Sequence, residues 1–83
     1  MFGVIFLTVK TMMGETHDIH VPQNCTIEQL KMKIFFELEV LPEQQVLMYQ
    51  DEELDEDDTV EDYNIEDGAT ISLFPKVASG FVL

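Results

Sequence analysis

The chain contains one cysteine and two histidines, the side chains that most often act as nucleophiles, bases or metal ligands. Cys25 precedes a predicted helix, whose first-turn amide dipoles could lower the pKa of its thiol. A catalytic cysteine needs a histidine base, and the pattern places neither His17 nor His20 reliably beside it. Strand alternation puts His17 on the inward register and His20 toward solvent, so the two cannot share one zinc ion. We therefore expect Cys25 to be structural and His17 to be an ordinary sheet residue rather than a pH switch. We also expect no metal, no cofactor and no enzyme activity.

An acidic segment runs from Asp51 to Asp62, where nine of twelve residues are Asp or Glu. Such charge density favours a solvated connection, provided that Leu54 and Val60 hold it against a core. The carboxylates of residues 55–58 leave a calcium site open as a minor alternative. The spacing and the glycine of an EF-hand loop are absent, however.

The charge balance restricts the class of partner. Seventeen acids against four lysines give a formal charge of −13, which argues against binding to phosphate backbones or to anionic membranes. A basic or neutral protein partner fits better. No segment reaches the roughly 20 apolar residues of a membrane span. The apolar start lacks a basic n-region, so we expect a buried strand there rather than a secretory signal. A lone cysteine favours the cytoplasm or the nucleus.

Apolar residues alternate in two runs that predict a β-hairpin. Ile5, Leu7 and Val9 face one way in the first run, and positions 17, 19 and 21 repeat the pattern in the second. Gly14 supplies the positive φ that the turn between them needs. Further strands are expected at residues 46–49, 52–54 and 70–74, with Pro75 marking where pairing ends.

One helix is predicted between the hairpin and the third strand. Residues 26–29, Thr-Ile-Glu-Gln, have the form of a capping box. Ile27, Leu30 and Ile34 then follow at helical spacing, with Lys31 and Lys33 expected off that stripe. The element order predicts an α+β fold in which the helix crosses one face of the sheet.

A series of short motifs runs along the chain: Val9-Lys10-Thr11, Gly14 in the first turn, Thr26-Ile27-Glu28, Lys31-x-Lys33-Ile34, Pro42-x-Gln44-Gln45 and Asp62-Tyr63-Asn64-Ile65. In the order and spacing of these motifs the chain resembles the ubiquitin family, without gaps from Ile5 to Gly80. The resemblance implies a β-grasp, a five-stranded mixed sheet packed on one α-helix, with the first and last strands parallel. It also implies that the Tyr63 ring packs at the edge of the core while its hydroxyl bonds nearby backbone.

The resemblance further implies a recognition surface on the sheet rather than an active site. Met12, Met48 and Phe74 fall where ubiquitin carries its aliphatic contact triad, and such an apolar cluster suits partner helices. Val46 and Lys76 replace the arginines that flank this triad, and Lys10 borders it. The alternative is that these residues shield the core or contact a neighbouring domain.

The carboxyl end departs from the conjugated members of the family. Ser79-Gly80 stands in place of their terminal Gly-Gly and is followed by Phe81-Val82-Leu83. Glu52 and Asp67 occupy the two lysine positions that are most used to extend ubiquitin chains. The resemblance thus favours a domain, residues 1–77, that is not conjugated, with residues 78–83 as a tail or the start of a linker. The ending Pro-x-Val-x-x-Gly also resembles the ubiquitin-like domain of midnolin-type proteins, which belongs to longer chains tied to proteasomal destruction of nuclear proteins.

The function expected from this reading is docking of a monomeric domain, part of a larger protein, to ubiquitin receptors or to the proteasome. The partners would be ubiquitin-interacting helices, ubiquitin-associated domains or proteasome receptors, and neither nucleic acid nor membrane. A covalent modifier trimmed after Gly80 and an acidic scaffolding domain for a non-proteasomal partner are the alternatives. A weaker idea is that Phe81-Val82-Leu83 binds a peptide groove by strand addition.

Overall fold

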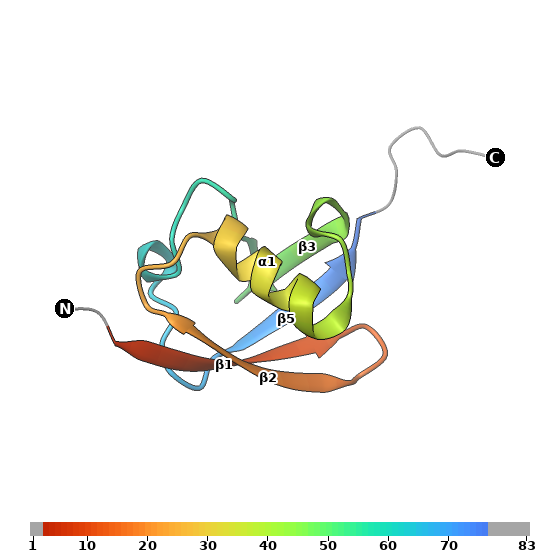
Figure 1. Ribbon diagram of the computed structural model, residues 1–83, viewed down its shortest axis with the longest axis horizontal. Helices are drawn as coiled ribbons and strands as arrows, with labels where there is room; N and C mark the ends of the chain where they lie inside the picture. The colour runs from red at the N-terminus through yellow and green to blue at the C-terminus, as the bar shows by residue number, and fades with distance from the viewer. Residues whose placement is uncertain (1–2, 77–83) are drawn as a thin grey trace.

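The computed structural model describes residues 3–76, which form five strands, one α-helix and two short 3₁₀ helices (Figure 1). The elements are β1 (Val4–Thr11), β2 (Thr16–Pro22), α1 (Ile27–Leu38), η1 (Pro42–Gln44), β3 (Gln45–Tyr49), β4 (Glu52–Glu53), η2 (Glu61–Tyr63) and β5 (Thr70–Pro75). The predicted α+β class and element order are confirmed. The predicted strand boundaries are correct to within one residue from β3 onward. Residues 77–83, including Ser79-Gly80 and the apolar end, lie outside the described residues.

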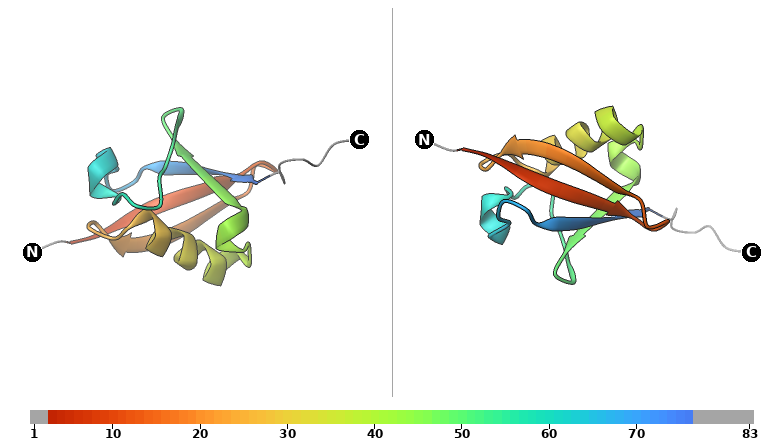
Figure 2. Two further views of the ribbon diagram at one scale, coloured as in Figure 1. Left: turned by 90° about the horizontal axis from the view of Figure 1, so that it is seen from above. Right: turned by 90° about the horizontal axis from the view of Figure 1, so that it is seen from below.

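The sheet is mixed, with the order β2-β1-β5-β3-β4. β1 pairs antiparallel with β2 and parallel with β5, and β3 pairs antiparallel with β5 and β4. The first and last strands are therefore the parallel neighbours that the family resemblance implied. The two views of Figure 2 show that α1 lies on one side of this twisted sheet, and the opposite side has no helix over it among residues 3–76.

A single core lies between the sheet and α1. Strand alternation sends Leu7, Val9 and Ile71 inward to meet Leu30 and Ile34 of the helix, all almost completely buried. The other buried members of this cluster are Ile5, Ile19, Val21, Cys25, Ile27, Leu47, Leu54, Val60, Ile65 and Leu73. Removing such side chains from water is the main favourable term in folding a domain of this size.

Helix α1 begins with the predicted capping box. The Gln29 amide donates to the Thr26 hydroxyl oxygen at 3.0 Å, and the Thr26 amide donates to the Gln29 side-chain oxygen at 2.9 Å. The expectation that Lys31 lies off the apolar stripe is wrong, because only 8% of its surface is exposed. Lys31 is one helical turn from Ile27, so its methylene stem packs on the same face while its ammonium reaches Glu56 at 3.1 Å.

The short helix η1 delivers β3 to the sheet. Gln45, at the start of β3, is buried and donates through its side-chain nitrogen to the carbonyls of Lys31 and Val40 at 2.9 and 2.8 Å. This amide therefore ties α1, the connection after it and β3 together. β5 ends at Pro75 as predicted, but the Lys76 amide still donates to the Gln44 carbonyl at 2.8 Å, so pairing extends one bond further.

The acidic segment follows the core closely instead of looping away from it. Leu54 and Val60 are buried, as predicted. The Tyr63 hydroxyl accepts from the Asp55 amide at 2.8 Å and donates to an Asp58 carboxylate oxygen at 3.0 Å. The role that the resemblance gave to the Tyr63 hydroxyl is therefore confirmed. The Asp55 amide lowers the pKa of this phenol, but burial and the neighbouring carboxylates outweigh it, and the pKa is raised overall.

Residues 3–76 hold no group of three potential metal ligands. Their single α-helix is also too short to cross a bilayer.

Candidate protein-binding surface

The predicted triad lies at one end of the sheet face that points away from α1. Because Leu47 and Leu73 are buried, the alternate residues Met48 and Phe74 point to the opposite face. Pairing aligns Lys10 with Ser72 and Ser72 with Met48, and it places Val46 opposite Phe74. Five residues predicted from the sequence for binding therefore project from this face or its end: Lys10, Met12, Val46, Met48 and Phe74. We call Met12, Met48 and Phe74 the triad.

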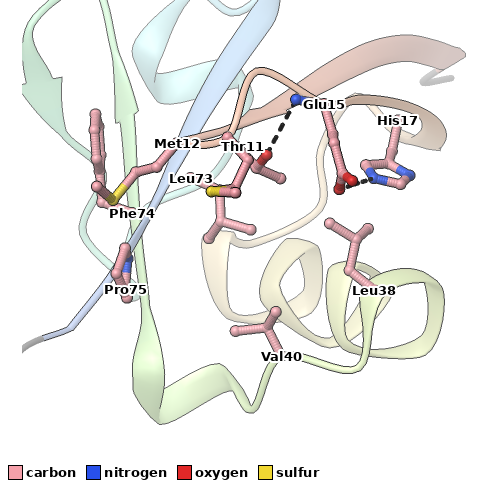
Figure 3. A pocket seen from close by; sticks show the side chains of 10 residues that line it. Thr11, Met12, Glu15, His17, Leu38, Val40, Leu73, Phe74 and Pro75 are labelled. Carbon is pink, nitrogen blue, oxygen red and sulfur yellow. Dashed lines mark hydrogen bonds and ion pairs between the residues drawn. The ribbon is translucent and has the colours of Figure 1, made fainter.

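Met12 and Phe74 form the exposed end of the triad. The parallel pairing of β1 and β5 matches Thr11 with Leu73, so Met12 falls level with Phe74. Figure 3 shows the Met12 side chain reaching from the hairpin turn toward Phe74. Met12 is 65% and Phe74 37% exposed, whereas Met48 and Val46 are half-buried. The turn thus adds a flexible apolar side chain to the flat surface of the strands.

A groove of about 490 Å³ opens beside the triad, between the hairpin turn, the end of α1 and the end of β5 (Figure 3). Its walls are largely apolar and comprise Thr11, Met12, Met13, Glu15, His17, Leu38, Val40, Leu73, Phe74 and Pro75. Met12 and Phe74 belong both to the groove and to the triad. A partner side chain could therefore reach from the sheet face into the groove without crossing a polar barrier.

Sequence reasoning did not assign Met13, Leu38 or Val40 to a binding surface. Leu38 is the last residue of α1, and Val40 continues its apolar pattern beyond the helix. This pattern indicates that the end of α1 offers more apolar surface than the sheet covers. Their approach to the hairpin turn depends on the chain reversal at Glu39, which has φ 63°. No local sequence pattern fixes that approach.

The charges around the triad are mixed. Lys10 projects from the same row as Met48, but Glu53 lies directly opposite Met48 on β4. Lys76 follows Phe74 by two residues and lines a second, polar cleft with Lys31 and the acids between residues 53 and 57. On its own face the triad therefore has a lysine, Lys10, on β1 and a carboxylate, Glu53, on β4, whereas Lys76 lines a separate polar cleft.

The two histidines and Cys25 lie in three different places. His17 lines the groove, with its Nε2 3.7 Å from a Glu15 carboxylate oxygen. His20 is exposed on the outer face against Phe6. Cys25 is buried, and this burial raises the pKa of its thiol, against the lowering expected from the helix dipole. Desolvation of the thiolate outweighs the backbone N–H donor, so the start of the helix does not make this thiol acidic.

Comparison with known proteins identifies relatives. A family model described as "Ubiquitin family" matches residues 7–77. The chain is 32% identical to the Midnolin homolog of Drosophila melanogaster over 78 residues, which make up 94% of this chain and 7% of that protein. It is 36% identical to the large proline-rich protein bag6 of Xenopus tropicalis over 67 residues, 81% of this chain and 6% of that protein. The BAG6 protein of Danio rerio is 35% identical over 71 residues, 86% and 6% of the two chains. The chain thus spans less than a tenth of the length of each relative.

Proposed function

This chain belongs to the ubiquitin family, and from that premise we propose that it is a protein-interaction domain that docks to ubiquitin receptors or to the proteasome and is not conjugated. The domain serves as one part of a larger protein of the cytoplasm or nucleus and carries no catalytic activity of its own. Its fit to 6–7% of the length of its relatives supports the placement within a larger protein.

The observation that carries this proposal is the triad itself. Three large, flexible or aromatic side chains lie on a sheet face that no helix of residues 3–76 covers, and two of them are exposed although apolar. Exposed apolar clusters of this kind in soluble proteins usually mark interfaces. Phe74 provides the anchor, because aromatic side chains in a partner groove carry a large share of binding energy.

The docking mode is a partner helix lying across β3 and β5 with its apolar side on the triad. Lys10 and Lys76 pair with acids on that helix, and Glu53 favours a basic or neutral residue where the helix crosses β4. Met13, Val40 and Leu38 receive a longer partner side chain in the groove. A single patch of this extent buries little area, so the complexes are weak and transient.

One feature of the chain supports lack of conjugation, and a second argues against the extension of ubiquitin-type chains on this domain. Ser79-Gly80 replaces the Gly-Gly that conjugated relatives present. Glu52 and Asp67, both exposed, stand at the positions of the chain-forming lysines. A carboxylate there cannot act as the amine nucleophile that an isopeptide bond requires.

Titration of the ¹⁵N-labelled domain with a ubiquitin-interacting helix, followed by NMR, tests the docking proposal. Shifts should cluster on the triad and on the groove, with Val46 and Lys10 at the margin. Shifts confined to the acidic segment 51–62, and lost at high salt, would favour the acidic-scaffold alternative and contradict the proposal.

A separate assay tests conjugation. The chain trimmed to Gly80 is mixed with ubiquitin-activating enzyme and ATP, with ubiquitin as the positive control. We expect no thioester with the trimmed chain. Formation of a thioester would support the covalent-modifier alternative.

A further inference from the structure

A second apolar patch lies on the same outer face, at the opposite end of β1 from the triad. It consists of Val4, Phe6, His20 and Pro22, which we call the N-terminal patch. Val4 is 56% and Phe6 59% exposed, and strand pairing sets Val4 opposite Pro22 and Phe6 opposite His20. The Phe6 ring does not contribute to the core, because the core lies on the other side of β1.

The backbone fixes the orientation of Phe6. Its amide donates to an Asp67 carboxylate oxygen at 2.7 Å, and its carbonyl accepts from the Gly68 amide at 2.7 Å. Both main-chain groups of Phe6 therefore point toward β5, which makes Phe6 and His20 a non-hydrogen-bonded pair with closely approaching side chains. Their ring centroids lie 5.8 Å apart with planes inclined at 48°. The His20 ring thus packs against one side of the Phe6 ring, and the rest of the Phe6 ring remains accessible to a ligand.

Two carboxylates are held near Phe6 by hydrogen bonds to β1. The Asp67 carboxylate accepts a hydrogen bond from the Phe6 amide. The Asp18 carboxylate accepts one at 3.2 Å from the hydroxyl of Thr8, which is the next residue after Phe6 on the outer face of β1. In each carboxylate one oxygen takes this bond, and the other has no hydrogen-bond partner within residues 3–76. The local bonds thus orient both acids beside the aromatic ring while leaving each an acceptor for an outside donor.

We propose that the N-terminal patch binds a basic protein segment, with an Arg or Lys side chain over Phe6 between Asp18 and Asp67. The cation is attracted by the ring face and by the free carboxylate oxygens together, and Arg suits this site best because its planar group can stack and donate at once. Apolar neighbours of that cation in the partner pack on Val4 and Pro22. A second copy of this chain is disfavoured as the occupant, since two domains of charge −13 repel each other.

The two ends of the face therefore have opposite electrostatic borders. Lys10 lies on β1 beside the triad, whereas Asp18 and Asp67 lie beside the N-terminal patch. The occupant of the N-terminal patch is a different segment from the helix proposed for the triad. The inference does not depend on the proposed function, because it uses a separate set of residues.

The test uses a short capped peptide of sequence GLRIRLG, added to the ¹⁵N-labelled chain and followed by NMR. Shifts should centre on residues 4–8, 18–22 and 67. Phe6→Leu keeps apolar bulk but lacks the ring face, and it should weaken binding about fivefold. Phe6→Tyr keeps the ring and should bind like the unmodified chain.

A pair of charge-matched variants separates this site from general attraction to an acidic protein. Asp18→Asn with Asp67→Asn keeps both acceptors for the local bonds but removes two charges, and it should weaken binding about tenfold. Glu52→Gln with Glu61→Gln removes two charges from exposed acids elsewhere and should change the Kd less than about twofold. Equal losses in the two double variants, or shifts centred on residues 51–62, would overturn the proposal.

Discussion

Replacing Phe74 by alanine should weaken docking at the triad without unfolding the domain. Phe74 is 37% exposed, and an aromatic side chain offers about 200 Å² in all, so roughly 75 Å² is open to a partner. At about 25 cal/mol per Å², full burial of that area contributes about 2 kcal/mol, or about a 20-fold change in Kd. The change of about 20-fold in Kd is an upper bound, because alanine still buries its Cβ and because part of the Phe74 ring at the rim of an interface stays in contact with water. We therefore expect a 5- to 20-fold increase in Kd.

The assay is an NMR or calorimetric titration of the ubiquitin-interacting helix into the unmodified and variant domains. Phe36→Ala is the matched control, since it deletes the same ring from α1, where Phe36 is 72% exposed and lies away from the outer sheet face. The spectrum of each variant should keep the dispersion of a folded domain. An unchanged Kd for Phe74→Ala, or an equal loss for Phe36→Ala, would refute docking on the triad.

Three further predictions concern stability in urea titrations. Tyr63→Phe deletes a hydroxyl that makes two hydrogen bonds and should cost about 1–2 kcal/mol; a loss no larger than that of Tyr49→Phe would contradict this. Glu56→Gln should destabilise by about 1–2 kcal/mol, because it leaves the Lys31 ammonium without its charged partner. Lys31→Met should cost less, because an apolar side chain can fill the place of the buried lysine stem and leaves no charge without a partner, and the reverse order would refute this reasoning. Burial raises the pKa of the Cys25 thiol in the folded domain. As pH rises, the unfolded chain therefore loses this proton at a lower pH than the folded domain does. The free energy of unfolding should fall as pH rises above about 8.5. Cys25→Ala should reduce that decline, and an unchanged decline would assign it to other groups.

The fold was largely predictable because local patterns and the fold agree. The alternation of apolar residues predicts which side chains of β1 face the core. Thr26 and Gln29, three residues apart, predict the start of α1 through their reciprocal hydrogen bonds. The parallel pairing of β1 with β5 has no local signature, since it joins residues about 60 positions apart. Only the family resemblance supplied that contact.

Sequence patterns predict least where two physical effects compete at one residue. Lys31 has the position of a core residue and the charge of a surface residue, and its long stem satisfies both. Cys25 sits near a helix start and also in the core, and desolvation has the larger effect on its pKa. The groove was missed for another reason, because it forms where a turn, a helix end and a strand end meet.

The central pairing of β1 with β5 also constrains when this domain can fold during synthesis. β1 and α1 leave the ribosome early, but β1 finds its inner neighbour only when residues 70–75 have emerged. The apolar sides of β1 and α1 stay partly uncovered until then, because the pairing of β1 with β5 joins residues about 60 positions apart. A chain that stalls before residue 70 should therefore be a target for chaperones or proteases. For a domain that we propose delivers its host to the degradation machinery, completion of β5 would also be the moment at which its docking face first exists.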